Sequence, residues 1–443
     1  MRTIDRSKGE YISTLYVVHC VDAEGPMSES LNDTFLRLKD VFGYEIEPTR
    51  DNLDKIQRMA LDAIVKKERG TIAEYFSQKN LEYLSNWQTI EGELNEIDRL
   101  RNQFSDDLGN KWTLTFFCVD HINYLSNPRN KVYGLGEIHS YYEKRVRNSN
   151  FNDEIQWHYH PKSISQNAIG LGSSFDNSLA EIHQILSHRI LEFEFFPTCY
   201  RPGFHAEGQD TNLFLEQWIP FDFANQRYSE SSTSQIAKLS LFANWTDAPP
   251  YWNAYHPSTR NVQEIGNLNR WIFRCLNIGS RHQNISEEHI EQAFIEATDN
   301  GSSVLSVTNH DYRAMTSEIK DLHNKIVKTK KRHEKVRVIY SSAQYAATRN
   351  LGLSKIEDPE ISIDIIGNRI VIKLIRGNLF SIQPYLAIKT KEENYLHDNL
   401  TPVECNVWKY DLTKDFIKKS EIEKIAIAYV GENGKAHIRK ISI

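Results

Sequence analysis

Short apolar stretches rich in β-branched and aromatic residues alternate with amphipathic stretches along most of the chain. The apolar runs are typical of buried strands, and several end directly in polar residues. Strand, polar turn and helix follow one another repeatedly, which favours an α/β barrel or a doubly wound parallel sheet. The predicted strands lie at residues 15–21, 112–119, 154–160, 304–308 and 336–340, and the clearest predicted helices at 178–190 and 286–298.

Two regions depart from this alternation. Residues 27–107 are highly charged and carry apolar residues at helical spacing, which predicts a helical insertion. After residue 350, apolar and polar residues alternate with period two on both sides of Gly367-Asn368, a pattern typical of a β-hairpin. We therefore expect an α/β domain over residues 1–350, interrupted by the insertion, and a small β-sandwich-like domain over residues 351–443.

The composition is that of a globular protein whose charges nearly balance. Hydrophobic residues make up 40% of the 443 residues, and the formal net charge of −6 gives no indication of a nucleic-acid-binding surface. No apolar run approaches the ~18 residues that a membrane-spanning helix needs, and the first residues lack the apolar core of a signal peptide. The five cysteines are far apart and include no CxxC, which is typical of free thiols in a reducing compartment. We expect a cytoplasmic protein with no nucleic-acid partner and no membrane span; its oligomeric state is open.

Carboxylate and imidazole side chains follow or end two of the predicted strands. Asp22 and Glu24 are close enough to divide a task, one binding a metal ion while the other accepts a proton. His158 and His160 lie two residues apart on a strand, so both imidazoles point to one side and can reach the same metal ion. Each pair also has a simpler interpretation, because Asp and Gly are common in turns and an HxH is common in ordinary polar packing.

Further side chains could take part in the same chemistry. Arg201 can orient a nearby carboxylate and hold it ionised, and His310 can act as a general acid after its strand. Tyr159, Trp245 and Trp252 offer flat aromatic faces on which a ligand can stack, so we expect them in a substrate cleft. The alternatives are a surface arginine in a tight turn, a structural histidine and a packed aromatic loop.

The order of these features resembles the polysaccharide deacetylases of the NodB-homology class, carbohydrate esterase family four. The sequence VVHCVDAEG, which contains Asp22 and Glu24, looks like the first family motif, and the histidine pair falls at the second. Arg201-Pro202-Gly203 is similar to the third motif and His310 to the last. The likeness covers about residues 14–345 without the insertion. The commoner family patterns are adjacent aspartates and HxxxH, where this chain has Asp-x-Glu and HxH.

The resemblance implies a distorted (β/α) barrel of the NodB type and a metal-dependent hydrolase. Its reaction would remove an N-acetyl or other acyl group from an amino-sugar substrate, in surface-polysaccharide biosynthesis. By the same resemblance Glu24, His158 and His160 bind a divalent metal ion, expected to be Zn²⁺. Asp22 is then the general base, Arg201 keeps it charged, and His310 protonates the leaving amine.

Two other functions remain compatible with the residues. The same metal chemistry could hydrolyse a different C–N bond, such as a formyl group, a cyclic amide or a ureide. A carbohydrate-binding protein whose barrel holds no metal ion is the non-enzymatic alternative. An expected cytoplasmic location favours a nucleotide-linked or lipid-linked sugar over a finished cell wall as the substrate.

Overall fold

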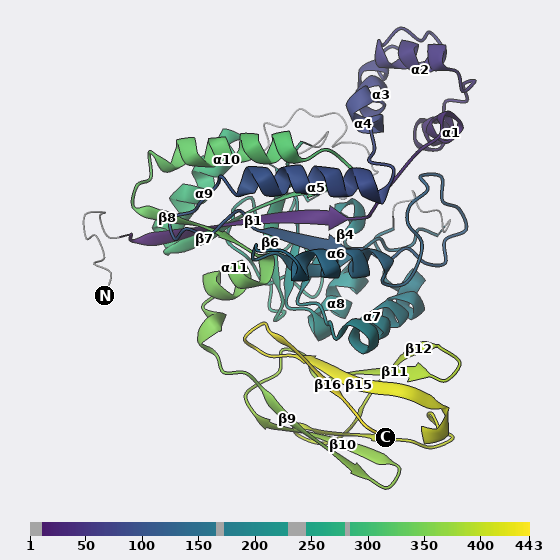
Figure 1. Ribbon diagram of the computed structural model, residues 1–443, viewed down its shortest axis with the longest axis vertical. Coiled ribbons are helices and arrows are strands. Elements are labelled where there is room, and N and C mark those ends of the chain that lie inside the picture. Colours follow the sequence, from purple (N-terminus) through teal and green to yellow (C-terminus); the bar gives the residue numbers. More distant parts are fainter. Residues whose placement is uncertain (1–10, 165–171, 229–244, 280–283) are drawn as a thin grey trace.

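A closed barrel of seven parallel strands forms the centre of the protein, and an eighth parallel strand extends it (Figure 1). The computed structural model describes residues 11–164, 172–228, 245–279 and 284–443. Of the two architectures that the sequence pattern favours, the barrel is present. The strands are β1 (Ser13–Ala23), β2 (Leu114–Cys118), β3 (Glu154–Tyr159), β4 (Cys199–Pro202), β5 (Phe221–Asn225), β6 (Trp271–Asn277), β7 (Ser302–His310) and β8 (Val336–Ser341).

The length of β1 explains how the eighth strand joins the barrel. One side of β1 pairs with β7 along nearly its whole length. On its other side, residues 13–18 pair with β8 and residues 19–23 pair with β2, which closes the barrel. Because every pairing is parallel, the carboxyl ends of β1 to β7 meet at one rim, and the loops at that rim can combine their side chains.

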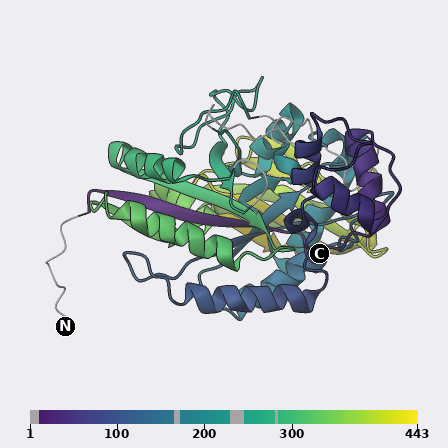
Figure 2. The same cartoon turned by 90° about the horizontal axis from the view of Figure 1, so that it is seen from above.

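Helices cover the outside of the barrel (Figures 1 and 2). The strands β1 and β7 are almost entirely buried, because one face fills the barrel and the other packs under helices. Within the described ranges, no helix is long and apolar enough to cross a membrane. The covering helices are α5 (Trp87–Arg101), α6 (Glu137–Arg147), α7 (Leu179–Phe193), α8 (Gln209–Trp218), α9 (Glu287–Asn300) and α10 (Thr316–Lys330). Helix α11 (Ala343–Asn350) instead packs its buried alanines against Val18, Cys20 and Phe273 on the inner face of the strands.

The segment 27–107, expected as one insertion, divides into two parts. Its first four helices form a cluster with a separate apolar core, in which Phe35, Leu53 and Ile72 meet, and this cluster projects from the barrel in Figure 1. Helix α5 instead packs its buried residues into the barrel core, so it is the crossover helix between β1 and β2. The projecting helices are α1 (Leu31–Phe42), α2 (Arg50–Gln57), α3 (Arg69–Tyr75) and α4 (Gln78–Leu81).

The residues after α11 form two four-stranded antiparallel sheets, as the alternating sequence predicts. Gly367, with a φ of 62°, and Asn368 connect β9 and β10 in the expected hairpin. Ile370 and Trp408 of one sheet share a core with Leu386 of the other. The first sheet has the order β13-β14-β10-β9 and the second β12-β11-β15-β16. The strands are β9 (Glu360–Ile366), β10 (Arg369–Arg376), β11 (Tyr385–Thr390), β12 (Tyr395–Asp398), β13 (Thr401–Glu404), β14 (Val407–Asp411), β15 (Ile422–Val430) and β16 (Ala436–Lys440).

The second sheet is covered on its outer face by α7 of the barrel domain. All six residues of β11 are buried. At this interface Nδ1 of His183 lies 2.9 Å from the Tyr385 hydroxyl, and His397 stacks on both rings with centroid distances of 4.4 and 3.9 Å. Burial lowers the pKa of His183 to about 3 and that of His397 to about 4. The two domains therefore meet over two histidines that are neutral at pH 7.

Acid is expected to destabilise this interface. In the unfolded chain both histidines take up a proton near pH 6.5, whereas in the folded protein they stay neutral down to about pH 4 or below. Since the unfolded state then binds more protons, the free energy of unfolding should fall as the pH drops from 6.5 to 4, by a few kcal/mol. Thermal unfolding measured across this range checks the expectation. A variant with His183→Asn and His397→Gln should have a flatter pH dependence, and an unchanged slope would contradict the assignment.

Candidate metal centre and active site

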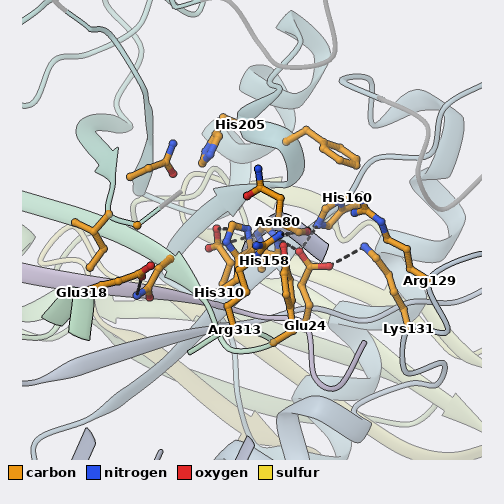
Figure 3. Close-up of a pocket in the computed structure, with 17 residues that line it drawn as sticks. Glu24, Asn80, Arg129, Lys131, His158, His160, His205, His310, Arg313 and Glu318 are labelled. Atoms are coloured by element: carbon orange, nitrogen blue, oxygen red, sulfur yellow. Dashed lines mark hydrogen bonds and ion pairs between the residues drawn. The ribbon is translucent and has the colours of Figure 1, made fainter. Parts of the chain in front are cut away.

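Side chains from the carboxyl ends of the barrel strands converge on one pocket (Figure 3). It encloses a cavity of about 70 Å³. Strand β1 supplies Asp22 and leads to Glu24, β3 supplies His158 and leads to His160, and β7 supplies His310. The five residues, far apart in the sequence, therefore line the same space.

Glu24, His158 and His160 form the candidate metal site. One ligand atom from each lies within 4.8 Å of the others, and all three residues are buried. The two Nε2 atoms are 3.0 Å apart, and Oε1 of Glu24 is 3.3 Å from Nε2 of His160 and 4.0 Å from Nε2 of His158. Atoms that bind a tetrahedral zinc ion at ~2.0–2.1 Å are about 3.3 Å from one another, so the three fit a divalent ion after small shifts. One carboxylate and two imidazoles leave a coordination position open, as in catalytic zinc sites.

Neighbouring backbone atoms orient both histidines. Nδ1 of His158 lies 2.8 Å from the carbonyl oxygen of Arg201, so this nitrogen carries the proton and Nε2 presents its lone pair. The ring of His160 lies directly against Gly203, where a Cβ atom would come within 2.3 Å of its Cγ. The Arg-Pro-Gly sequence therefore positions both histidines. The Arg201 carbonyl accepts a hydrogen bond from His158, and glycine at position 203 leaves room for the ring of His160.

Asp22 lies beside the candidate ligands and is held by Arg201. Nε and Nη2 of the arginine donate to Oδ1 and Oδ2 at 2.6 and 3.0 Å, and the Thr308 hydroxyl lies 3.3 Å from Oδ2. Burial by itself raises the pKa of Asp22, but the charge of Arg201, aided by His158 and His310, brings it below its ordinary value. Asp22 is therefore ionised at neutral pH, and Arg201 makes the contact that its expected role requires.

Lys131 belongs to this site, although the sequence did not reveal it. Its Nζ lies 2.7 Å from Oε2 of Glu24, and its side chain is buried. Burial raises the pKa of Glu24, but the charges of Lys131 and His160 hold it well below its usual range. Lys131 thus binds one oxygen of Glu24 and leaves Oε1 facing the two imidazoles. It comes from the loop between β2 and α6, which carries no recognisable motif.

Asp311 shapes the turn that follows β1. Its carboxylate oxygens accept hydrogen bonds from the backbone N–H groups of Glu24 and Gly25, each at 2.9 Å, and from the Tyr142 hydroxyl at 2.7 Å. Burial raises the pKa of Asp311 to about 7. A carboxylate directly after His310, at the end of a predicted strand, is a sequence signal for such a residue.

His310 faces Asp22 from the neighbouring strand. Its Nε2 lies 3.9 Å from Oδ2 of Asp22, and its side chain is 22% exposed, so it can be reached from the pocket. Burial lowers the pKa of His310 to about 4, although the charges of Asp22 and Glu24 act in the opposite direction. The imidazole is therefore neutral at pH 7.

The turn after β4 borders the pocket with an unusual backbone. Phe204 and His205 have φ values of 53° and 54°, in the left-handed region that favours glycine. Such a conformation costs ~1–3 kcal/mol per residue and is found most often at functional sites. Both side chains line the pocket, and Nδ1 of His205 lies 3.4 Å from Nη2 of Arg201.

The three aromatic residues expected in a substrate cleft are located elsewhere, which corrects that prediction. Tyr159 points away from the histidine pair into the core beneath α7. Trp252 is fully buried and donates its Nε1–H to the carbonyl of His289. Trp245 lies in a small apolar cluster and donates to the carbonyl of His205. A loop that buries large rings has the same composition as one that exposes them to a ligand, so the sequence could not separate the two.

Comparison with protein-family models and with curated proteins gives no match for this chain. The function is therefore inferred from the residues of the site and their geometry.

Proposed function

We propose that the protein is a metal-dependent hydrolase that removes an N-acyl group, in the first instance N-acetyl, from an amino-sugar substrate. The observation that supports this most strongly is the position of Asp22, bound to Arg201, next to three converging ligand atoms. A buried carboxylate kept ionised beside a metal site is suited to accept a proton from water. The amino sugar as substrate follows from the likeness in motif order to the NodB-class deacetylases.

The residues of the pocket can divide the reaction among them. A divalent ion held by Glu24, His158 and His160 would lower the pKa of a water molecule and polarise the acyl carbonyl. Asp22, oriented by Arg201, accepts the proton of the attacking water. His310 is neutral at pH 7, so it must take up a proton before it can give one to the leaving amine, and Asp22 at 3.9 Å can supply it.

Zinc is the proposed metal ion. Two imidazoles and one carboxylate form a donor set that suits zinc, whereas magnesium and calcium prefer oxygen ligands only. The proposed NodB type rests on the order of the motifs along the chain. The HxH pair departs from the commoner HxxxH, but its two Nε2 atoms lie 3.0 Å apart, so both imidazoles can reach one metal ion.

Metal content and product release test this proposal together. Protein purified without chelator is expected to contain near-stoichiometric zinc or a similar ion, and to release acetate from N-acetylated amino sugars. Chelation should abolish the release and added metal should restore it. A panel of formamides, cyclic amides and ureides, assayed in parallel, distinguishes the other C–N bonds.

Two outcomes would contradict the proposal. Protein that binds no metal ion but retains a glycan would indicate a binding protein. Metal-dependent hydrolysis confined to the formamides, cyclic amides or ureides would keep the chemistry and change the substrate.

A further inference from the structure

Arg129 lies in the wall of the candidate pocket, and no carboxylate of the described residues forms an ion pair with it. It comes from the loop between β2 and α6, is 8% exposed, and its Nε has no hydrogen-bond partner among the described residues. Glu29 is the acid whose charge acts on it, but both oxygens of Glu29 are bound by Arg37 at 2.7 Å. A buried guanidinium without an anionic partner is unfavourable, so this position is suited to a ligand.

Arg313, which is partly buried and lies over the rings of Tyr83 and Tyr312, adds a second guanidinium from the loop after β7. It donates to the backbone carbonyls of Lys79 and Asn80 at 2.9 and 3.1 Å, and the described residues contain no carboxylate in an ion pair with it. These bonds bring the end of the helical cluster to the pocket, where Asn80 forms part of the wall. The projecting helices therefore contribute to the place where a substrate would bind.

The remaining charges of the pocket are already paired. Asp22 is bound by Arg201 and Glu24 by Lys131. Glu318, the third carboxylate in the wall, lies 3.6 Å from Nζ of Lys79. Among the residues that the structure describes, Arg129 and Arg313 have no carboxylate in an ion pair, and a divalent ion at the histidine pair would increase the positive charge further. Figure 3 shows Arg129 and Lys131 reaching toward Glu24 and His160 from the same side.

We propose that the substrate is an anionic amino sugar, whose phosphate or carboxylate group is bound by Arg129 while its amide lies at the metal site. The planar guanidinium can donate two parallel hydrogen bonds to either oxyanion, and Arg313 adds long-range attraction. This inference rests on the proposed function, since it places the second group of the same substrate. It makes Arg129 a substrate-binding residue that the sequence did not indicate.

Binding to metal-free protein tests the inference separately from the reaction. Titration calorimetry compares three probes: N-acetylglucosamine, its 6-phosphate, and N-acetylmuramic acid, which carries a carboxylate. One or both anionic sugars are expected to bind at least about 10-fold more tightly than the neutral sugar, and more weakly as salt increases. The phosphate and carboxylate arms identify which oxyanion the site prefers.

Variants of Arg129 separate ligand binding from a structural role. Arg129→Gln should weaken binding of the preferred anionic sugar about 10- to 100-fold and leave the neutral sugar unaffected. Arg129→Lys should recover only part of the loss, because lysine cannot donate as a fork. The melting temperature of ligand-free Arg129→Gln should equal or exceed that of the parent, because an unpaired buried charge has been removed.

Equal affinity for neutral and anionic sugars would overturn the inference, as would no binding of either anionic probe. A lower melting temperature in ligand-free Arg129→Gln, with anion binding retained, would make Arg129 a structural residue. If anionic sugars bind through Arg129 but no probe is hydrolysed with metal present, the inference stands and the proposed reaction fails. If the parent and Arg129→Gln hydrolyse neutral sugars at the same rate and neither prefers an anionic sugar, the proposed reaction stands and the inference fails.

Discussion

Replacing Asp22 by Asn is expected to lower turnover about 10²- to 10⁴-fold while the protein retains its metal ion. The amide cannot accept the proton of the attacking water, and Asp22 is not among the three converging ligand residues. The substitution also leaves the buried Arg201 without its bidentate partner, at 2.6 and 3.0 Å in the parent, so stability should fall by ~3–5 kcal/mol. Steady-state kinetics and metal analysis on the folded variant measure the two effects separately.

A second buried pair provides the matched control for this substitution. Asp153 binds Arg101 through both oxygens at 2.6 and 2.7 Å, at the amino end of β3 and therefore at the opposite end of the barrel from the pocket. Asp153→Asn should also lower stability, though by less, because Arg101 keeps Asp98 at 2.8 Å, and turnover should be unchanged. Equal activity losses in the two variants would mean that Asp22 acts through folding, and full activity in Asp22→Asn would remove it as the base.

The candidate metal ligands could be predicted because the geometry of a strand determines which of its side chains point to the same side. Side chains two apart on a strand share a face, so His158 and His160 had to point together, and residues just after parallel strands meet at one rim. The structure places both imidazoles in the pocket. Lys162, which would be the second position of an HxxxH, pairs with Glu181 at 2.6 Å instead.

The supporting charges could not be predicted in the same way. Lys131 and Arg129 lie in a loop whose path depends on the folded barrel, and no spacing in the sequence relates either of them to Glu24. Lys131 stands out only in the folded protein, where it is buried and pairs with Glu24. Arg129 stands out because it is buried and its Nε has no hydrogen-bond partner among the described residues. Loops that bind ligands have few local constraints, which is why a motif search passes over them.

Two features of the fold could not be predicted from the local sequence pattern, because they depend on packing partners that are distant in sequence. Helix α5 has the same kind of apolar spacing as the projecting helices, so only its packing partners show that it belongs to the barrel. Strand β6 contains Arg274 in the middle of its apolar run, so its sequence does not show the pattern of a buried strand. The guanidinium donates to the carbonyls of Arg227 and Pro250 at 2.9 and 2.6 Å, and these partners are distant in sequence.

Replacing His158 by Ala is expected to abolish both metal binding and activity. His158 provides one of three converging ligand atoms, and its Nδ1 is held by the Arg201 carbonyl at 2.8 Å, which fixes the direction of Nε2. Metal content after dialysis should fall from near-stoichiometric to near zero. Turnover should fall at least about 10³-fold, because the several kcal/mol of charge stabilisation that a metal ion supplies are lost.

Tyr159→Phe is the matched control on the same strand, since Tyr159 faces the core beneath α7 rather than the pocket. This variant should keep its metal ion and its turnover, with at most a modest decrease in melting temperature from the lost hydroxyl. If His158→Ala keeps its metal ion while remaining folded, the ion lies elsewhere and the Glu24–His158–His160 site is wrong. If Tyr159→Phe loses metal as well, the strand as a whole has moved, and the loss in His158→Ala cannot be assigned to a missing ligand.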